Sequence, residues 1–255
     1  MLTLTLISLL CAADAGPVDA GVKGADAGVV LADAGMLAGA VGAPKLTPEV
    51  KALVDRVQSF YEKTADFTAG FEQRYAYTAS KRTQTSTGQV TFKKPALMRW
   101  EYEKPSKKTF VLAGQKIYAY DPEAKLLTVA AIGTNQLSAS VTFLWGQGKL
   151  ADEFAIVARP CAPVDGGACA TQVLEMTPLK PDPRFKRVLL EVDLKTAQVL
   201  KSTVIDPDGS QNAISFLDLK TNTGVDAAGF KLNVPPDTQV QDFTGGAKPT
   251  PDAGK

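Results

Sequence analysis

Few side chains in this 255-residue chain are suited to chemistry on a substrate. Histidine is absent, which excludes a histidine general base, a Ser-His-Asp triad and imidazole ligands for a metal. Asp206 and Asp208 form a carboxylate pair, but they belong to the sequence Asp-Pro-Asp-Gly, which is typical of a hairpin turn. The common glycine-rich nucleotide loops are also absent. We therefore expect no enzyme activity, no cofactor and no metal site.

The cysteines offer a second kind of chemistry. Cys161 and Cys169 flank a turn-rich loop between two predicted strands. In an exported protein this pair is a candidate for a local disulfide, and two free thiols are the alternative. A single pair of cysteines at this spacing, without further ligands, is a weak signal for a metal site. Cys11 is a weak candidate for lipid attachment, because Leu10 stands where such a motif has a small residue.

The ends of the chain differ from its middle. Residues 1–15 form a short apolar run that ends in Ala13-Asp-Ala15, as in a secretory signal peptide. Residues 16–46 repeat Asp-Ala-Gly and are interpreted as a low-complexity linker. We expect one folded domain over 47–243 and a disordered tail over 244–255. The net charge of +1 does not indicate a nucleic-acid partner.

Helix signals open the folded part. Thr47, Pro48 and Glu49 fit the N-cap and first turn of a helix. An apolar stripe at helical spacing follows. It comprises Val50, Leu53, Val54, Val57, Phe60 and Tyr61.

Alternation of apolar and polar residues then predicts a sheet of about eleven strands. Met98, Trp100 and Tyr102 fall on one face, while Arg99 and Glu101 fall on the other. The expected strands start within 67–77 and continue at 88–93, 97–102, 108–113, 116–120, 126–131, 153–158, 171–177, 187–194, 199–205, 213–220 and 231–234. Since no crossover helices separate them, the sheet should be antiparallel and strongly curved. A short apolar helix over 140–150 is a candidate cover for an opening.

Four segments, in order and at matching spacing, resemble the periplasmic outer-membrane lipoprotein carrier family. They are the amphipathic helix followed by Phe-Thr-Ala-Gly-Phe-Glu-Gln at 67–73, Phe-Lys-Lys-Pro through Arg-Trp-Glu-Tyr at 92–102, Ala-Gly-Gln-Lys-Ile-Tyr-Ala-Tyr-Asp-Pro at 113–122, and the segment 225–240 with its Val-Pro-Pro-Asp. The resemblance implies a mainly β half-barrel, antiparallel and strongly curved, whose hydrophobic cavity is closed by helices. It further implies a periplasmic, non-enzymatic chaperone that is monomeric and shuttles lipoproteins from the inner to the outer membrane.

The resemblance also implies partners and site residues. The partners are acylated lipoproteins, an inner-membrane lipoprotein-releasing ABC transporter and an outer-membrane lipoprotein acceptor. Lys94 stands at the family's latch position, where a basic residue, often arginine, holds the lid closed; a solvated strand-end lysine is the alternative. The residues expected to bind lipid are Phe92, Met98, Trp100, Tyr102, Leu112 and Ile117. They are explained equally well as ordinary core. For the whole chain, an outer-membrane lipoprotein acceptor or another lipid-binding module of the same fold is the alternative to the carrier.

Overall fold

A computed structural model describes residues 46–131, 149–161 and 168–244. The predicted signal peptide, nearly all of the predicted linker and tail, and most of the predicted helix over 140–150 lie outside these residues. The elements in chain order are α1 (Pro48–Lys63), β1 (Asp66–Ala76), β2 (Thr83–Lys93), β3 (Leu97–Lys104), β4 (Lys108–Ala113), β5 (Lys116–Asp121), β6 (Leu126–Ala131), α3 (Leu150–Glu153), β7 (Phe154–Ala158), β8 (Thr171–Pro178), β9 (Arg187–Asp193), β10 (Val199–Ile205), β11 (Gln211–Thr221), η5 (Ala227–Phe230) and β12 (Gln239–Phe243).

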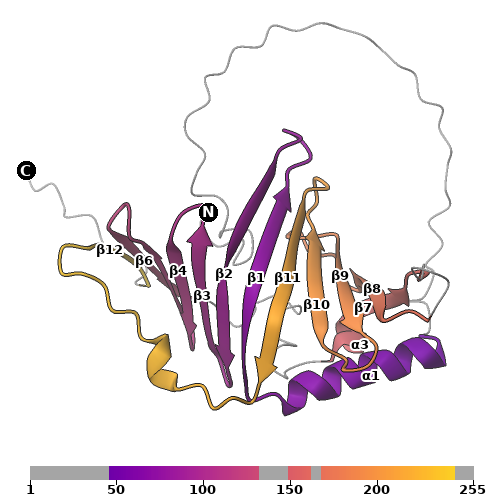
Figure 1. Cartoon of the computed structure of the whole chain (residues 1–255). Coiled ribbons are helices and arrows are strands. Elements are labelled where there is room, and N and C mark those ends of the chain that lie inside the picture. The colour runs from indigo at the N-terminus through magenta and orange to yellow at the C-terminus, as the bar shows by residue number, and fades with distance from the viewer. Residues whose placement is uncertain (1–45, 132–148, 162–167, 245–255) are drawn as a thin grey trace, which may run out of the picture.

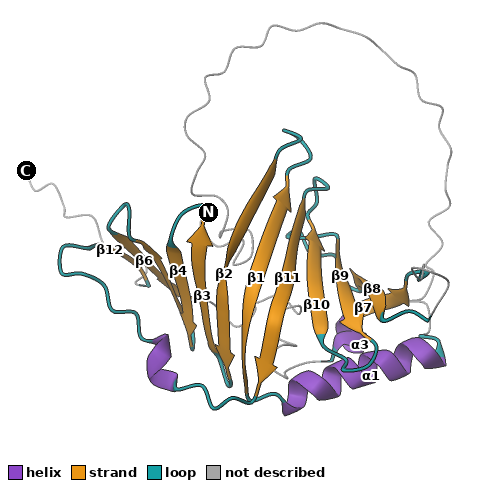
Figure 2. Ribbon diagram, viewed as in Figure 1, coloured by secondary structure: helices purple, strands orange, loops and turns teal. Residues whose placement is uncertain are grey.

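One curved sheet contains all twelve of these strands, in the order β12-β6-β5-β4-β3-β2-β1-β11-β10-β9-β8-β7. Neighbouring strands run antiparallel from β6 to β7, which confirms the predicted fold class. Figure 2 shows the open, curved sheet with few helices.

The last strand corrects the prediction. Residues 231–234 form no strand, and β12 instead begins at Gln239, where its amide donates to the carbonyl oxygen of Lys125. Pro235 and Pro236 follow the predicted segment and have no N–H to give to a ladder, which explains why pairing starts later. β12 also runs parallel to β6, in contrast to the expected all-antiparallel sheet.

The helix α1 forms where the sequence predicts it. The side chain of Thr47 accepts a hydrogen bond from the amide of Val50, and Pro48 opens the first turn. Its apolar stripe buries Leu53, Val54 and Val57 against strands β7 to β10. In Figure 1 the helix lies across that end of the sheet. We call the face on which α1 packs the helix face.

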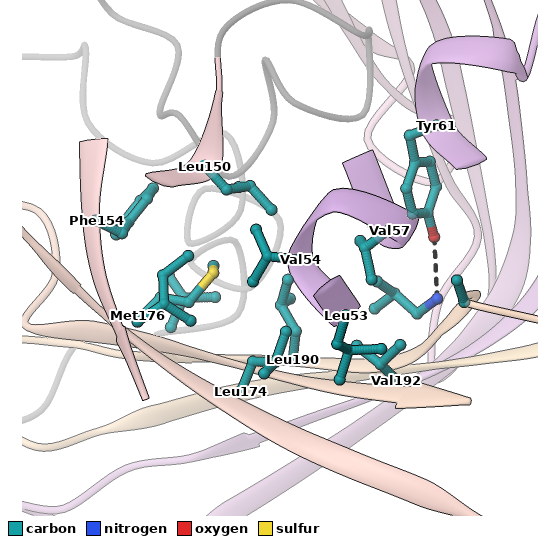
Figure 3. Close-up of a cluster of buried hydrophobic side chains, with 14 of the residues drawn as sticks. Leu53, Val54, Val57, Tyr61, Leu150, Phe154, Leu174, Met176, Leu190 and Val192 are labelled. Atoms are coloured by element: carbon teal, nitrogen blue, oxygen red, sulfur yellow. Dashed lines mark hydrogen bonds between the residues drawn. The ribbon is translucent and has the colours of Figure 1, made fainter. Parts of the chain in front are cut away.

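Two apolar clusters form the core. The first cluster joins α1 and α3 to β7–β10 and includes Leu174, Met176 and Leu190 (Figure 3). The second cluster takes its described members from β1–β5 and β11 alone. The ladder pairs Leu174 with Leu190, Leu190 with Ser202 and Ser202 with Ile214, so both clusters lie on the helix face. Phe216 packs against both.

Candidate lipid-binding face and lid contact

The second cluster contains all six residues that the sequence singled out for lipid binding. Phe92, Met98, Tyr102 and Leu112 are buried, while Trp100 and Ile117 are partly buried at its margin. The structure therefore brings these six side chains to one place.

Strand register explains how the cluster forms. Phe67 is opposite Phe92, Phe92 opposite Met98, and Met98 opposite Leu112, which is in turn opposite Ile117. These residues make one apolar row across five strands, because directly paired side chains in an antiparallel ladder share a face. Period-2 alternation along each strand then adds further rows beside it.

Aromatic rings cover much of this surface. The ring of Phe71 meets those of Trp100 and Tyr102 edge-on, at centroid distances of 4.8 and 4.9 Å. Phe67 and Phe92 stack at 5.1 Å. Such geometries add to the hydrophobic gain from burial. The described members of the second cluster are therefore apolar or aromatic, and none of them is charged.

The sequence reasoning missed other members of the second cluster. The strand pattern places Phe67 and Phe71 at even spacing in β1, and this signal is enough to assign both to the same face. Ile214 and Phe216 reach the cluster because β11 pairs with β1. That pairing joins segments far apart in the chain, and local pattern does not reveal it.

Lys94 lies at the corner between β2 and β3 and contacts the end of α1. Its ammonium donates to the carbonyl oxygens of Tyr61 and Glu62, both at 2.8 Å. These carbonyls belong to the last turn of the helix, where a cation is favourable. Burial lowers the pKa of Lys94, and the nearby Glu62 carboxylate opposes that shift. Lys94 thus connects the helix to the strands of the second cluster.

Other contacts fix α1 to the opposite half of the sheet. Arg56 donates to the carbonyl oxygens of Leu194 and Lys195, at 2.7 and 3.1 Å. The hydroxyl of the buried Tyr61 accepts a hydrogen bond from the amide of Val199 (Figure 3). Burial raises the pKa of this phenol well above its usual value, so the hydroxyl stays neutral. The helix is therefore attached to the turn between β9 and β10 through the exposed Arg56, to β10 through the buried Tyr61, and to the β2–β3 corner through Lys94.

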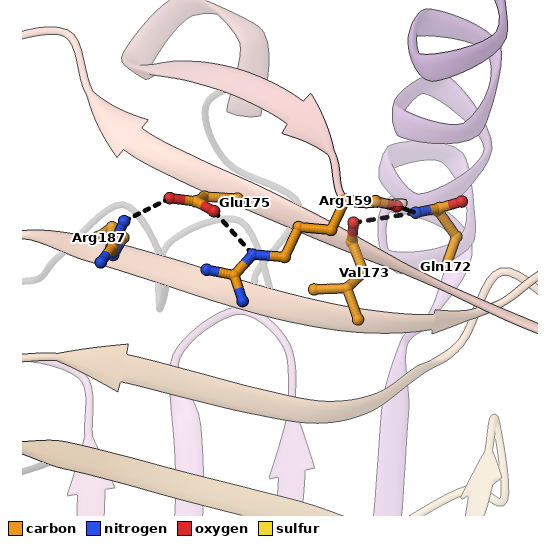
Figure 4. A network of polar contacts seen from close by, with 5 residues as sticks. All are labelled: Arg159, Gln172, Val173, Glu175 and Arg187. Atoms are coloured by element: carbon orange, nitrogen blue, oxygen red, sulfur yellow. Dashed lines mark hydrogen bonds and ion pairs between the residues drawn. The ribbon is translucent and has the colours of Figure 1, made fainter. Parts of the chain in front are cut away.

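The outer face of the sheet, opposite the helix face, is polar where β7–β9 meet. Glu175 alternates with the buried Leu174 and Met176, so its carboxylate points outward. It accepts from Arg159 and Arg187, each at 2.7 Å (Figure 4). The hydrogen bond from Arg159 and that from Arg187 lower the pKa of Glu175. At β7–β9 the outer face is therefore charged, whereas the helix face is apolar.

Cys161 and Cys169 form a disulfide between the ends of β7 and β8. Within the described ranges, no cluster of three or more acidic, cysteine or histidine side chains is arranged for a metal. No helix in those ranges is long and apolar enough to cross a membrane.

Residues 62–233 match the family model described as outer membrane lipoprotein carrier protein LolA. The chain belongs to the LolA family. This membership confirms the resemblance that the four sequence segments indicated.

Two relatives named as outer-membrane lipoprotein carriers agree with the LolA assignment. An outer-membrane lipoprotein carrier protein of Pseudomonas aeruginosa strain UCBPP-PA14 is 28% identical over 202 residues, which cover 79% of this chain and 93% of that protein. Its counterpart in Xanthomonas campestris pv. campestris strain B100 is 30% identical over 161 residues, covering 63% and 74%. Among solved structures, a LolA superfamily protein from Nitrosomonas europaea aligns with a TM-score of 0.40 at 11% identity, over 71% of this chain and 97% of that one.

Proposed function

We propose that this protein is a periplasmic carrier that binds the acyl chains of lipoproteins and shuttles them from the inner to the outer membrane. Membership of the LolA family supports this role. The observation that carries it in the structure is the second cluster, an apolar surface whose described members all come from strands. The helix α1 buries its apolar stripe elsewhere, against the first cluster.

The energetics of the task explain why such a surface is needed. Each methylene transferred from water to an apolar site gains about 0.8 kcal/mol, so one acyl chain exposed to water costs on the order of 10 kcal/mol. Crossing an aqueous compartment therefore requires a shield. In our proposal the acyl chains lie along the aromatic surface formed by Phe71, Trp100 and Tyr102, with Phe92, Met98, Leu112 and Ile117 around it.

This function requires binding and release and no bond-breaking step. The proposed donor is an inner-membrane lipoprotein-releasing ABC transporter, and the proposed recipient is an outer-membrane lipoprotein acceptor. In our proposal the carrier acts as a monomer.

Lys94 is the proposed latch between α1 and the β2–β3 corner. In the empty protein its two hydrogen bonds hold the end of α1 against the β2–β3 corner. Acyl chains that enter beside the second cluster separate this contact, and its re-formation favours release. Lysine offers a compact ammonium for this purpose in place of the planar guanidinium frequent in the family.

Depletion of the protein in its own cells tests the function. We expect lipoproteins destined for the outer membrane to accumulate at the inner membrane, as measured by fractionation and immunoblotting. Re-expression of the wild type should restore sorting, and a variant carrying Arg187→Gln on the outer face should restore it equally. Correct sorting after complete depletion would count against the carrier role.

A second measurement tests cargo binding directly. Inner-membrane vesicles that hold an acylated lipoprotein and its transporter are incubated with ATP and the purified protein. We expect a soluble complex of lipoprotein and carrier on gel filtration. A lipoprotein precursor that lacks its acyl chains is the matched control, and equal binding of that precursor would exclude acyl recognition.

A further inference from the structure

The apolar surface of the second cluster ends at a buried polar row. Along the helix face of β1, Phe67, Ala69 and Phe71 are followed by Gln73. On β11 the corresponding change is from Ile214 to Asn212. On β2 it is from Val90, through Gly88, to the buried Ser86 opposite Gln73. On each of these three adjacent strands, the side chains on the helix face therefore change from apolar to polar within a few residues.

Side-chain hydrogen bonds join this row across the sheet. The hydroxyl of Tyr102 donates to Gln73 Oε1 at 2.8 Å, and Gln73 Nε2 donates to Asn212 Oδ1 at 2.9 Å. Gln73 and Asn212 are each only 1% exposed, so both amides lie away from solvent. We call Tyr102, Gln73 and Asn212 the polar row.

Stability does not explain the polar row. The backbone ladder already sets the register of β1 with β11 on both sides of Gln73. Replacing hydrogen-bonded buried groups by apolar groups of similar shape is commonly neutral or stabilising. Apolar side chains in place of Gln73 and Asn212 would continue the surrounding apolar surface. We therefore look for a role of the two amides other than stability.

Beyond the row, two carboxylates lie in the turn between β10 and β11. Tyr75, the next residue of β1 on this face, donates its hydroxyl to the carboxylate of Asp206. Asp208 lies in the same turn, bonded to Ser210. The rings of Tyr75 and Tyr77 lie beyond the row too, with centroids 4.3 Å apart. An apolar ligand that extends past the row therefore meets buried amides, a hydrogen-bonded phenol and carboxylates, and burying such polar groups without their partners is costly.

We propose that the polar row sets the depth to which an acyl chain can extend along the helix face, and so determines the chain length that the carrier accepts. This inference rests on the proposed function, because it presumes that the ligand is a linear acyl chain on the second cluster. A chain that reaches the row gains nothing from further methylenes unless it breaks the hydrogen bonds between Tyr102, Gln73 and Asn212.

Binding of straight-chain fatty acids of increasing length tests the depth limit. Affinity is measured by displacement of a fluorescent fatty acid from the full protein. Each added methylene should tighten binding about fourfold until the chain reaches the row, after which affinity should level off. In the triple variant Gln73→Leu, Asn212→Leu and Tyr102→Phe, the fourfold steps should continue for at least two further carbons.

Controls separate this outcome from effects on folding. Gln89→Leu makes the same kind of change at an exposed position on β2 and should leave the levelling point unchanged. If the triple variant does not fold, Tyr102→Phe alone removes one bond of the row and should still raise affinity for the longest chains relative to wild type.

The possible results distinguish the two proposals. Wild-type affinity that rises without levelling, or a levelling point that is the same in wild type and both row variants, overturns the depth limit and leaves acyl binding intact. Failure of the wild type to bind any fatty acid overturns the proposed binding function, and the depth limit with it.

Discussion

The ammonium of Lys94 lies 2.8 Å from the carbonyl oxygen of Tyr61, whose own hydroxyl accepts a hydrogen bond from Val199 on β10. One residue of α1 thus connects both halves of the sheet, through its backbone to the β2–β3 corner and through its side chain to β10. Any opening that separates α1 from the second cluster must break the bond to Lys94, whereas the buried bond to Val199 can persist.

Replacing Lys94 by leucine should slow delivery of cargo. Loss of the two hydrogen bonds destabilises the empty, closed state by about 1 kcal/mol, while the loaded state is unaffected. The equilibrium then shifts toward the loaded state, and transfer of a bound lipoprotein to its acceptor should fall about fivefold. Lys94→Arg should retain transfer, since it preserves donors to the same carbonyls. Transfer by Lys94→Leu at the wild-type rate would exclude the latch.

Glutamate substitutions should separate a binding surface from a structural core. Met176 is fully buried in the first cluster, and an unpaired carboxylate there should prevent folding. Trp100 is only partly buried in the second cluster, so Trp100→Glu should yield a folded protein that no longer binds acyl chains. Circular dichroism and fatty-acid displacement measure the two properties. If Trp100→Glu unfolds as Met176→Glu does, the second cluster is an ordinary core.

Local sequence pattern was sufficient for most of the elements but not for their distant partners. The capping signals of Thr47 and Pro48 and the alternation around Trp100 depend on neighbouring residues, and both predictions are confirmed. The bond between Gln73 and Asn212 joins residues 139 positions apart. No periodicity links two such strands, so the polar row was not predictable.

The contacts of Lys94 illustrate a different limit. Its acceptors are backbone carbonyls, which every residue possesses, so they leave no signature in the sequence. The family resemblance indicated the position, and the structure supplied the partners Tyr61 and Glu62. The parallel pairing of β12 with β6 was missed for a related reason, since a strand pattern does not encode the direction of its neighbour.

Asp66 should make stability depend on pH in the acidic range. Its buried carboxylate accepts from the amide and hydroxyl of Thr223 and from the amide of Gly224. Burial raises its pKa, but these hydrogen bonds outweigh burial and leave the pKa below its usual value. Because the unfolded chain then binds the proton more readily, the stabilisation is complete above about pH 4 and is lost as the pH falls through the folded-state pKa.

The variant Asp66→Asn checks this linkage. At neutral pH it should lower the free energy of unfolding by about 1 to 3 kcal/mol, measured by urea denaturation. The difference from wild type should shrink below about pH 4. Asp237→Asn, which removes an exposed partner of Lys125, should change stability little at any pH. A difference for Asp66→Asn that stays constant down to strongly acidic pH would contradict the assignment.

Gly88 should tolerate no side chain, because β2 and β3 approach closely at this point. A Cβ atom there would lie 2.0 Å from the carbonyl oxygen of Glu101 and 2.9 Å from the ring of Phe71. The backbone oxygen cannot move without disturbing the ladder, whose register shifts between Thr87 and Gly88. Gly88→Ala should therefore lower the free energy of unfolding by about 3 kcal/mol in urea denaturation.

Gly229→Ala is the matched control, since nothing lies within 4 Å of its added atom, and it should stay within about 0.5 kcal/mol of wild type. Because Phe71 also contacts Trp100 and Tyr102, any folded Gly88→Ala protein should bind acyl chains more weakly. Equal unfolding midpoints for the two glycine variants would show that the strands can separate at this point without cost.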